Sequence, residues 1–115
     1  MSDKYNGWTN YETWNAKLWM YNDVGSYNYW NERAQETYDA AEADDSFTRD
    51  ERAALDLADI LKDEHEGNMP ELPASFWSDI LNAALSEVNW YEIATSLIED
   101  VEKAEPEPEA TDADA

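Results

Sequence analysis

Apolar side chains recur at intervals of three and four residues in five separate segments of this chain. That spacing places them on one face of an α-helix, and no segment shows the alternation of apolar and polar residues that is typical of a β-strand. The predicted helices cover residues 10–21, 27–43, 49–66, 76–88 and 90–101. The sequence therefore predicts an all-α fold, a compact bundle of about five short helices with mostly antiparallel neighbours.

Three of the predicted helices begin with a polar residue followed by Glu at the third position. In such a capping box the first side chain accepts a hydrogen bond from the third amide, and the Glu side chain bonds back to the first amide. The pairs are Thr9–Glu12, Thr48–Glu51 and Asn89–Glu92. Gly25 and Ser26 predict the break between the first two helices, and two prolines predict a connector over residues 68–74.

The apolar faces predict which residues form the core. In the first helix they are Tyr11, Trp14, Leu18 and Tyr21, and four tryptophans are expected to be buried across the domain, namely Trp14, Trp30, Trp77 and Trp90. Each such ring can remove roughly 150–250 Å² from water, so a few of them suffice for a small core.

The last eleven residues have a different composition from the rest. They read EPEPEATDADA and contain neither aromatic nor branched aliphatic side chains. Such a segment has no large apolar side chains whose burial could offset the conformational entropy lost on ordering it. We therefore expect a single helical domain over residues 1–104 and a disordered acidic tail over residues 105–115.

Charge limits the partners that the chain can have. Seven basic residues face 28 acidic ones, which gives a net charge of −21. This field repels phosphate backbones and anionic lipid headgroups, so direct binding to nucleic acid or membranes is not expected. The N-terminus lacks the charged and apolar regions of a signal peptide, and no run of 18 apolar residues occurs, so we expect a cytoplasmic protein.

No motif in the chain dictates a reaction. The absence of cysteine excludes thiol catalysis and zinc–thiolate sites, and three glycines leave no phosphate-binding loop. The one histidine, His65, has no second ligand three or four residues away, so it is interpreted as a solvated surface residue. We expect neither an enzyme nor a bound metal or cofactor; a carboxylate-based, metal-dependent enzyme is the remaining alternative.

Candidate partner-binding residues are of two kinds. Trp19 and Tyr29 point away from the apolar faces of their own helices, so each either packs in a second interface or binds a partner, as exposed Trp and Tyr often do. Between residues 36 and 66, twelve acids meet three bases. The acidic candidates from that region are Glu36, Asp39, Glu42, Asp44, Asp45, Asp56, Asp59 and Asp63.

Three explanations of this acidity remain open. Carboxylates on a helical surface keep a protein soluble. A sustained carboxylate array can also imitate the phosphates of a DNA duplex and occupy a basic nucleic-acid-binding surface of a host or viral protein. A dense acidic surface can finally be an adaptation to molar salt, where screening acts over roughly 3 Å.

Polar residues are regularly placed among the aromatic residues near the N-terminus. Asn10, Glu12 and Asn15 lie next to Tyr11 and Trp14 in the segment NYETWN. They form either a recognition surface or a hydrogen-bonded network that fastens the N-terminal segment over the core. We favour fastening, because short polar side chains near a helix start readily bond local backbone groups.

Two segments carry a family resemblance. Residues 5–30 (YNGWTNYETWNAKLWMYNDVGSYNYW) and 81–100 (LNAALSEVNWYEIATSLIED) resemble a family of short uncharacterised proteins of phages, plasmids and other mobile elements, which open with NGWTNYETWN and continue with LW. The chain departs from that pattern at Lys17 and Met20. The resemblance implies a viral or mobile-element origin and favours a protein that binds a host component, without implying an activity.

Overall fold

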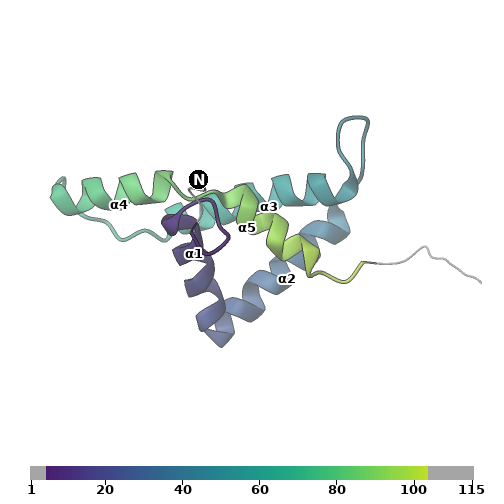
Figure 1. Ribbon diagram of the computed structural model, residues 1–115, viewed down its shortest axis with the longest axis horizontal. Helices are drawn as coiled ribbons and strands as arrows, with labels where there is room; N and C mark the ends of the chain where they lie inside the picture. Colours follow the sequence, from purple (N-terminus) through teal and green to yellow (C-terminus); the bar gives the residue numbers. More distant parts are fainter. Residues whose placement is uncertain (1–4, 104–115) are drawn as a thin grey trace, which may run out of the picture.

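The computed structural model describes residues 5–103, which form five α-helices (Figure 1). The predicted all-α class and the number of helices are confirmed. The predicted disordered tail and the domain end at residue 104 lie outside the described residues. The helices are α1 (Tyr11–Asn22), α2 (Val24–Ala40), α3 (Arg49–Gly67), α4 (Phe76–Ser86) and α5 (Trp90–Glu99).

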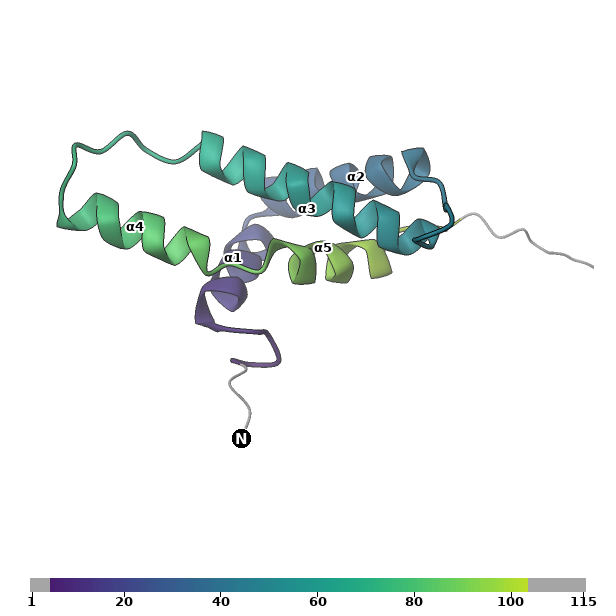
Figure 2. The same cartoon turned by 90° about the horizontal axis from the view of Figure 1, so that it is seen from above.

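Four of the helices build the core, and α4 lies outside it. α1 and α2 form a V, α3 runs back along α2, and α5 packs chiefly against α3 and also touches α1 and α2 (Figure 1). α4 projects beyond one end of this group, on a long connector from α3 (Figure 2). Of the α4 side chains, Leu85 packs against the buried cluster.

The core consists of aliphatic and aromatic side chains from α1, α2, α3 and α5, together with Ala41 after α2. Its members are Met20, Trp30, Ala34, Tyr38, Ala41, Ala53, Ala54, Leu57, Leu61, Trp90, Ile93, Ala94, Leu97 and Ile98. The helical segments predicted over residues 27–43, 49–66 and 90–101 supply all of this list except Met20. Met20 is 2% exposed.

Two parts of the predicted core are wrong. Trp77 is 71% exposed, because α4 does not lie against the body of the protein. In α1 the predicted face is also misplaced. Tyr11 and Leu18 are exposed and Trp14 is only half-buried, while Thr13 and Met20 are buried. This helix has aromatic residues on several sides, so the spacing of apolar residues alone did not identify the side that is covered.

The break between α1 and α2 is shorter than predicted. Asp23 alone separates them, and its carboxylate caps α2 by accepting a hydrogen bond from the amide of Ser26 at 2.9 Å. Gly25 therefore lies in the first turn of α2, and Ser26 does not cap the helix. The predicted box at Thr48 and Glu51 is confirmed, with both of its hydrogen bonds present.

The N-terminus of α1 is fastened to the N-terminus of α5. Asn10 caps α1 through Oδ1, which accepts hydrogen bonds from the amide and the hydroxyl of Thr13. The Thr13 hydroxyl oxygen in turn accepts a hydrogen bond from the amide of Asn89 at 2.8 Å. The Asn10 amide group donates to the carbonyl of Glu87 at 2.7 Å. Asn10 and Thr13 of the NYETWN segment thus fasten α1 to the start of α5, whereas Glu12 and Asn15 make no side-chain hydrogen bond with another described residue.

The members of this network differ from those predicted. Thr9 and Glu12 do not form a capping box; instead the amide of Thr9 donates to the Glu92 carboxylate at 2.9 Å. Asn89 caps α5 as predicted, by accepting a hydrogen bond from the Glu92 amide. The carboxylate of Glu92 therefore contacts a residue far away in sequence, and the cap of α1 moves one residue to Asn10.

Candidate partner-binding surface

The predicted acidic residues lie along the end of α2, the loop that follows and the exposed side of α3. Glu36 and Asp39 lie on α2, and Glu42, Asp44 and Asp45 lie in the loop. Asp56, Asp59 and Asp63 are spaced by three and four residues on α3, so they share one side of that helix. Leu57 and Leu61, on the other side, are fully buried, which turns the acidic side toward solvent.

Half of these acids are engaged within the chain. Glu36 pairs with Arg33 at 3.4 Å, Asp39 accepts a hydrogen bond from Gln35, and Asp44 and Asp56 pair with Arg52 at 3.4 and 3.7 Å. The other four make no side-chain hydrogen bond or ion pair with another described residue; they are Glu42, Asp45, Asp59 and Asp63.

The basic side chains of residues 5–103 are all held by the chain itself. Arg33, Arg52, Lys62 and Lys103 make ion pairs with carboxylates, and Arg49 donates hydrogen bonds to the carbonyls of Tyr38 and Asp39. The Lys17 ammonium lies 3.9 Å from the centre of the Tyr21 ring, and burial lowers the pKa of this amine. The unpaired carboxylates therefore dominate the field around α3.

Asp44 orders the loop between α2 and α3. Its carboxylate accepts hydrogen bonds from the amides of Ser46 and Phe47, both at 2.8 Å. These two bonds, helped by Arg52, hold the pKa of Asp44 below its ordinary value of 3.8. The side chain thus favours its charged form when the loop is folded.

We expect the Asp44 turn to lose stability in acid. Because the folded state has the lower pKa, the stabilisation is present above the ordinary pKa of 3.8 and is lost as the pH falls through the lowered value. In an NMR titration the amide signals of Ser46 and Phe47 should follow a midpoint below 3.8. In the Asp44→Asn variant that shared transition should be absent; if it persists there, another group causes it.

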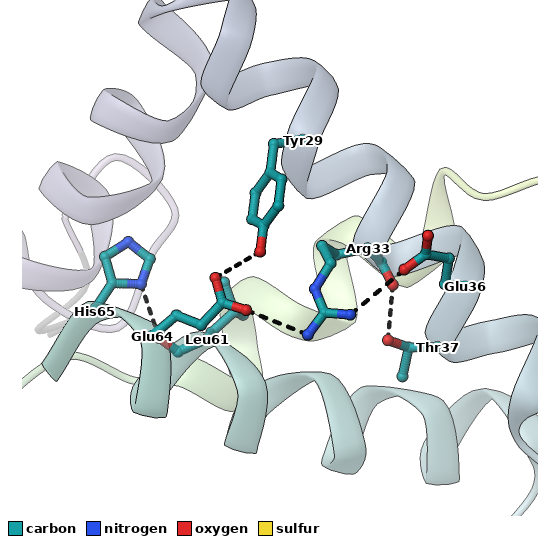
Figure 3. Close-up of polar contacts among 7 residues, drawn as sticks. All are labelled: Tyr29, Arg33, Glu36, Thr37, Leu61, Glu64 and His65. Atoms are coloured by element: carbon teal, nitrogen blue, oxygen red, sulfur yellow. Dashed lines mark hydrogen bonds and ion pairs between the residues drawn. The ribbon is translucent and has the colours of Figure 1, made fainter. Parts of the chain in front are cut away.

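Tyr29 belongs to a polar cluster between α2 and α3 (Figure 3). Its hydroxyl donates a hydrogen bond to Glu64 at 2.7 Å, and the other oxygen of Glu64 pairs with Arg33 at 3.2 Å. The hydrogen bond to Glu64 raises the pKa of Tyr29 above its ordinary value of 10.0. The hydroxyl is therefore engaged within the chain, although the residue is 41% exposed.

Trp19 lies apart from the acids of the loop. It is 67% exposed near the end of α1, before α2 begins, whereas Glu42 to Asp45 follow the end of α2. α2 has 17 residues and is thus about 25 Å long. The structure does not bring Trp19 and the loop acids together, so a partner that contacts both must extend along α2.

His65 is not the solvated side chain that the sequence indicated. Its ring is stacked between Trp30 and Trp90, with centroid distances of 5.4 and 4.9 Å, and Nδ1 lies 2.8 Å from the carbonyl oxygen of Leu61. The spacing of four residues from Leu57 to Leu61 to His65 was a usable signal for this position, because it continues the buried face of α3.

The described residues hold no grouped metal ligands. Among residues 5–103, no three His, Asp or Glu side chains lie close enough together to hold one ion. A hollow of about 490 Å³ lies beside α5, between Trp8, Glu92 and Glu99. Glu92, in its wall, is already bonded to the Thr9 amide.

Among residues 5–103, no helix combines the length and apolar character needed to cross a membrane.

A comparison with protein families matches nearly the whole chain. The matching model is described as a family of unknown function (DUF7249), and it covers residues 1–105. The chain belongs to this family. The match includes both segments on which the resemblance rested, as well as the acidic middle between them. Neither the curated proteins nor the solved structures contain a match to the chain.

Proposed function

We propose that this chain is a non-catalytic acidic binding module of viral or mobile-element origin, acting in the cytoplasm of a host cell. In this proposal it occupies a basic surface that a host or viral protein otherwise uses for nucleic acid. The supporting observation is the row formed by Asp56, Asp59 and Asp63 on α3, in a chain whose described cations are all engaged internally. Asp59 and Asp63 are exposed and make no ion pair with another described residue, and Asp56 is partly exposed beside Arg52.

The spacing of the row supports mimicry of a phosphate strand. With a rise of about 1.5 Å per residue, these carboxylates repeat every ~4.5–6 Å along α3. One DNA strand carries a phosphate every ~3.4 Å of helix axis, so the charge density of the row is somewhat lower but of the same order. Asp44 and Asp45, near the start of α3, extend the negative surface beyond the helix.

The proposal predicts that the row competes with DNA. In a fluorescence-anisotropy assay with a basic DNA-binding protein of the host, the chain should displace a labelled duplex. The triple variant Asp56→Asn, Asp59→Asn and Asp63→Asn should compete about 10–100-fold less well, because each exposed ion pair contributes about 0–1 kcal/mol. The effect should shrink as salt is added, since the charges are exposed.

A second triple variant separates position from net charge. Glu32→Gln, Glu71→Gln and Glu99→Gln remove the same number of charges from exposed positions away from the α3 row. They should leave competition within about twofold of the wild type, because charges outside the contact act only through the weak long-range field. Equal losses in both triple variants would reduce the mimicry to non-specific charge.

The salt-adaptation alternative has a separate test. A fold stabilised by molar salt should gain much of its stability between about 0.1 and 2 M KCl, as carboxylate repulsion is screened. The proposal expects cooperative unfolding already at the lower concentration. A protein that folds only in molar salt and displaces no DNA would support adaptation to salt instead of binding.

A further inference from the structure

α4 carries an apolar surface that the rest of the chain leaves uncovered. Phe76 is 66% exposed, Trp77 71% and Ile80 51%, and none of the eleven residues of the helix is buried. Soluble monomers rarely leave large contiguous apolar patches exposed, and such patches often mark a protein interface. Figure 2 shows the helix projecting from the body, where a second molecule can reach it.

The exposed side of α4 is bulky at one end and small at the other. Phe76, Ile80 and Ala83 follow one another at spacings of four and three, and Trp77 and Ala84 lie beside them on the same side of the helix. The two aromatic residues occupy the first turn, and the two alanines occupy the last turns. A helix that packs on this side must offer small residues opposite the rings and large residues opposite the alanines.

We propose that this surface binds the α4 helix of a second copy of the chain. If the two helices run antiparallel about a two-fold axis at Ile80, Phe76 of each copy faces Ala83 of the other, and Trp77 faces Ala84. The large end of the surface then meets its small end in both directions, as an isologous contact requires. The proposal concerns a different surface from the acidic row, and neither depends on the other.

Charge opposes a second copy less at α4 than elsewhere on the chain. The chain has a net charge of −21, so two copies repel each other over most of their surfaces. Within α4, Asp79 is the one charged residue, so this helix offers a contact with little repulsion. The two-fold axis places the two Asp79 side chains on the same rim of the contact, and their repulsion sets a measurable salt dependence.

The exposed area indicates a weak dimer. At the exposures of Phe76 and Trp77, each ring can remove roughly 100–170 Å² from water. Four rings and the two Ile80 side chains then bury on the order of 500–800 Å² in total, below the ~1,200 Å² of standard interfaces. We therefore expect a dissociation constant on the order of 10–100 μM and a monomer at low concentration.

A disulfide cross-link tests the position of the axis. The natural chain has no cysteine, so Ile80→Cys introduces a single thiol that meets its symmetry mate across the axis. Asn82→Cys, also exposed but on the opposite side of α4, is the matched control. Under mild oxidation the first variant should form a covalent dimer and the second should not. Equal cross-linking of both, or of neither, would overturn the proposal.

Sedimentation velocity over about 1–200 μM tests the packing. Ala83→Trp fills the space opposite Phe76 and should raise the dissociation constant about tenfold or more, whereas a merely adhesive surface would bind more tightly with the added ring. Val24→Ser removes an apolar side chain of similar exposure outside α4 and should change nothing. Asp79→Asn should tighten the dimer a few-fold at low salt.

A wild-type chain that stays monomeric over this whole concentration range would contradict the proposal, and another protein would then cover α4.

Discussion

Replacing Trp90 with Ala is expected to lower the free energy of unfolding by about 3–5 kcal/mol, the range for buried aromatic residues cut back to Ala. Trp90 is 7% exposed at the start of α5, where its ring stacks on His65. The substitution leaves a cavity beside the imidazole and removes one side of its stack. At about 4–8 °C per kcal/mol for a domain of this size, the thermal midpoint should fall by roughly 12–40 °C.

Trp77→Ala is the matched control for this experiment. The same change of side chain at a ring that is 71% exposed should alter the stability of the monomer by less than about 0.5 kcal/mol. Both variants should be measured by circular dichroism at low micromolar concentration, where self-association does not contribute. Similar losses for the two variants would mean that α4 is folded against the body in solution.

Replacing Thr13 with Val is expected to cost about 2–4 kcal/mol, although the two side chains have nearly the same shape. Thr13 is fully buried, and its hydroxyl connects the side chain of Asn10 to the amide of Asn89. Valine removes both hydrogen bonds and leaves the Asn89 amide without its partner. Urea unfolding, followed by tryptophan fluorescence, measures the change in free energy.

Thr95→Val controls for the change from hydroxyl to methyl. The Thr95 hydroxyl is buried and has no hydrogen-bond partner among the described residues. Removing it should be neutral or slightly stabilising, because an unsatisfied polar group is replaced by an apolar one. Should Thr13→Val behave like Thr95→Val, the junction between α1 and α5 would contribute little to stability.

Local signals in the sequence were sufficient for most helix boundaries. The Thr48 cap was predictable, because both of its partners lie within three residues of it. At the start of α1, Thr9 and Asn10 are neighbouring residues with similar capping ability. Two contacts with distant residues decide between them. The amide of Thr9 bonds to Glu92, 83 residues away, and the side chain of Asn10 bonds to Glu87, 77 residues away. A local pattern carries no information about such partners.

The candidate surface was predictable in composition but not in arrangement. The helical spacing of Asp56, Asp59 and Asp63 was enough to place them on one side of a helix. The bond from Tyr29 to Glu64 spans 35 residues and depends on how α2 lies along α3. Likewise, the apolar spacing of α4 correctly indicated an amphipathic helix, but it could not show that the apolar side remains uncovered within the chain.

The joining of α1 to α5 also determines when the chain can fold during its synthesis. α5 contributes Trp90, Ile93, Ala94, Leu97 and Ile98 to the core, and of the five described helices it is synthesised last. Until α5 has been synthesised, the inner faces of α2 and α3 remain open to water. Glu87 and Asn89, which bond to the start of α1, have also not been synthesised. We therefore expect the five helices to complete their fold only after α5 has been made.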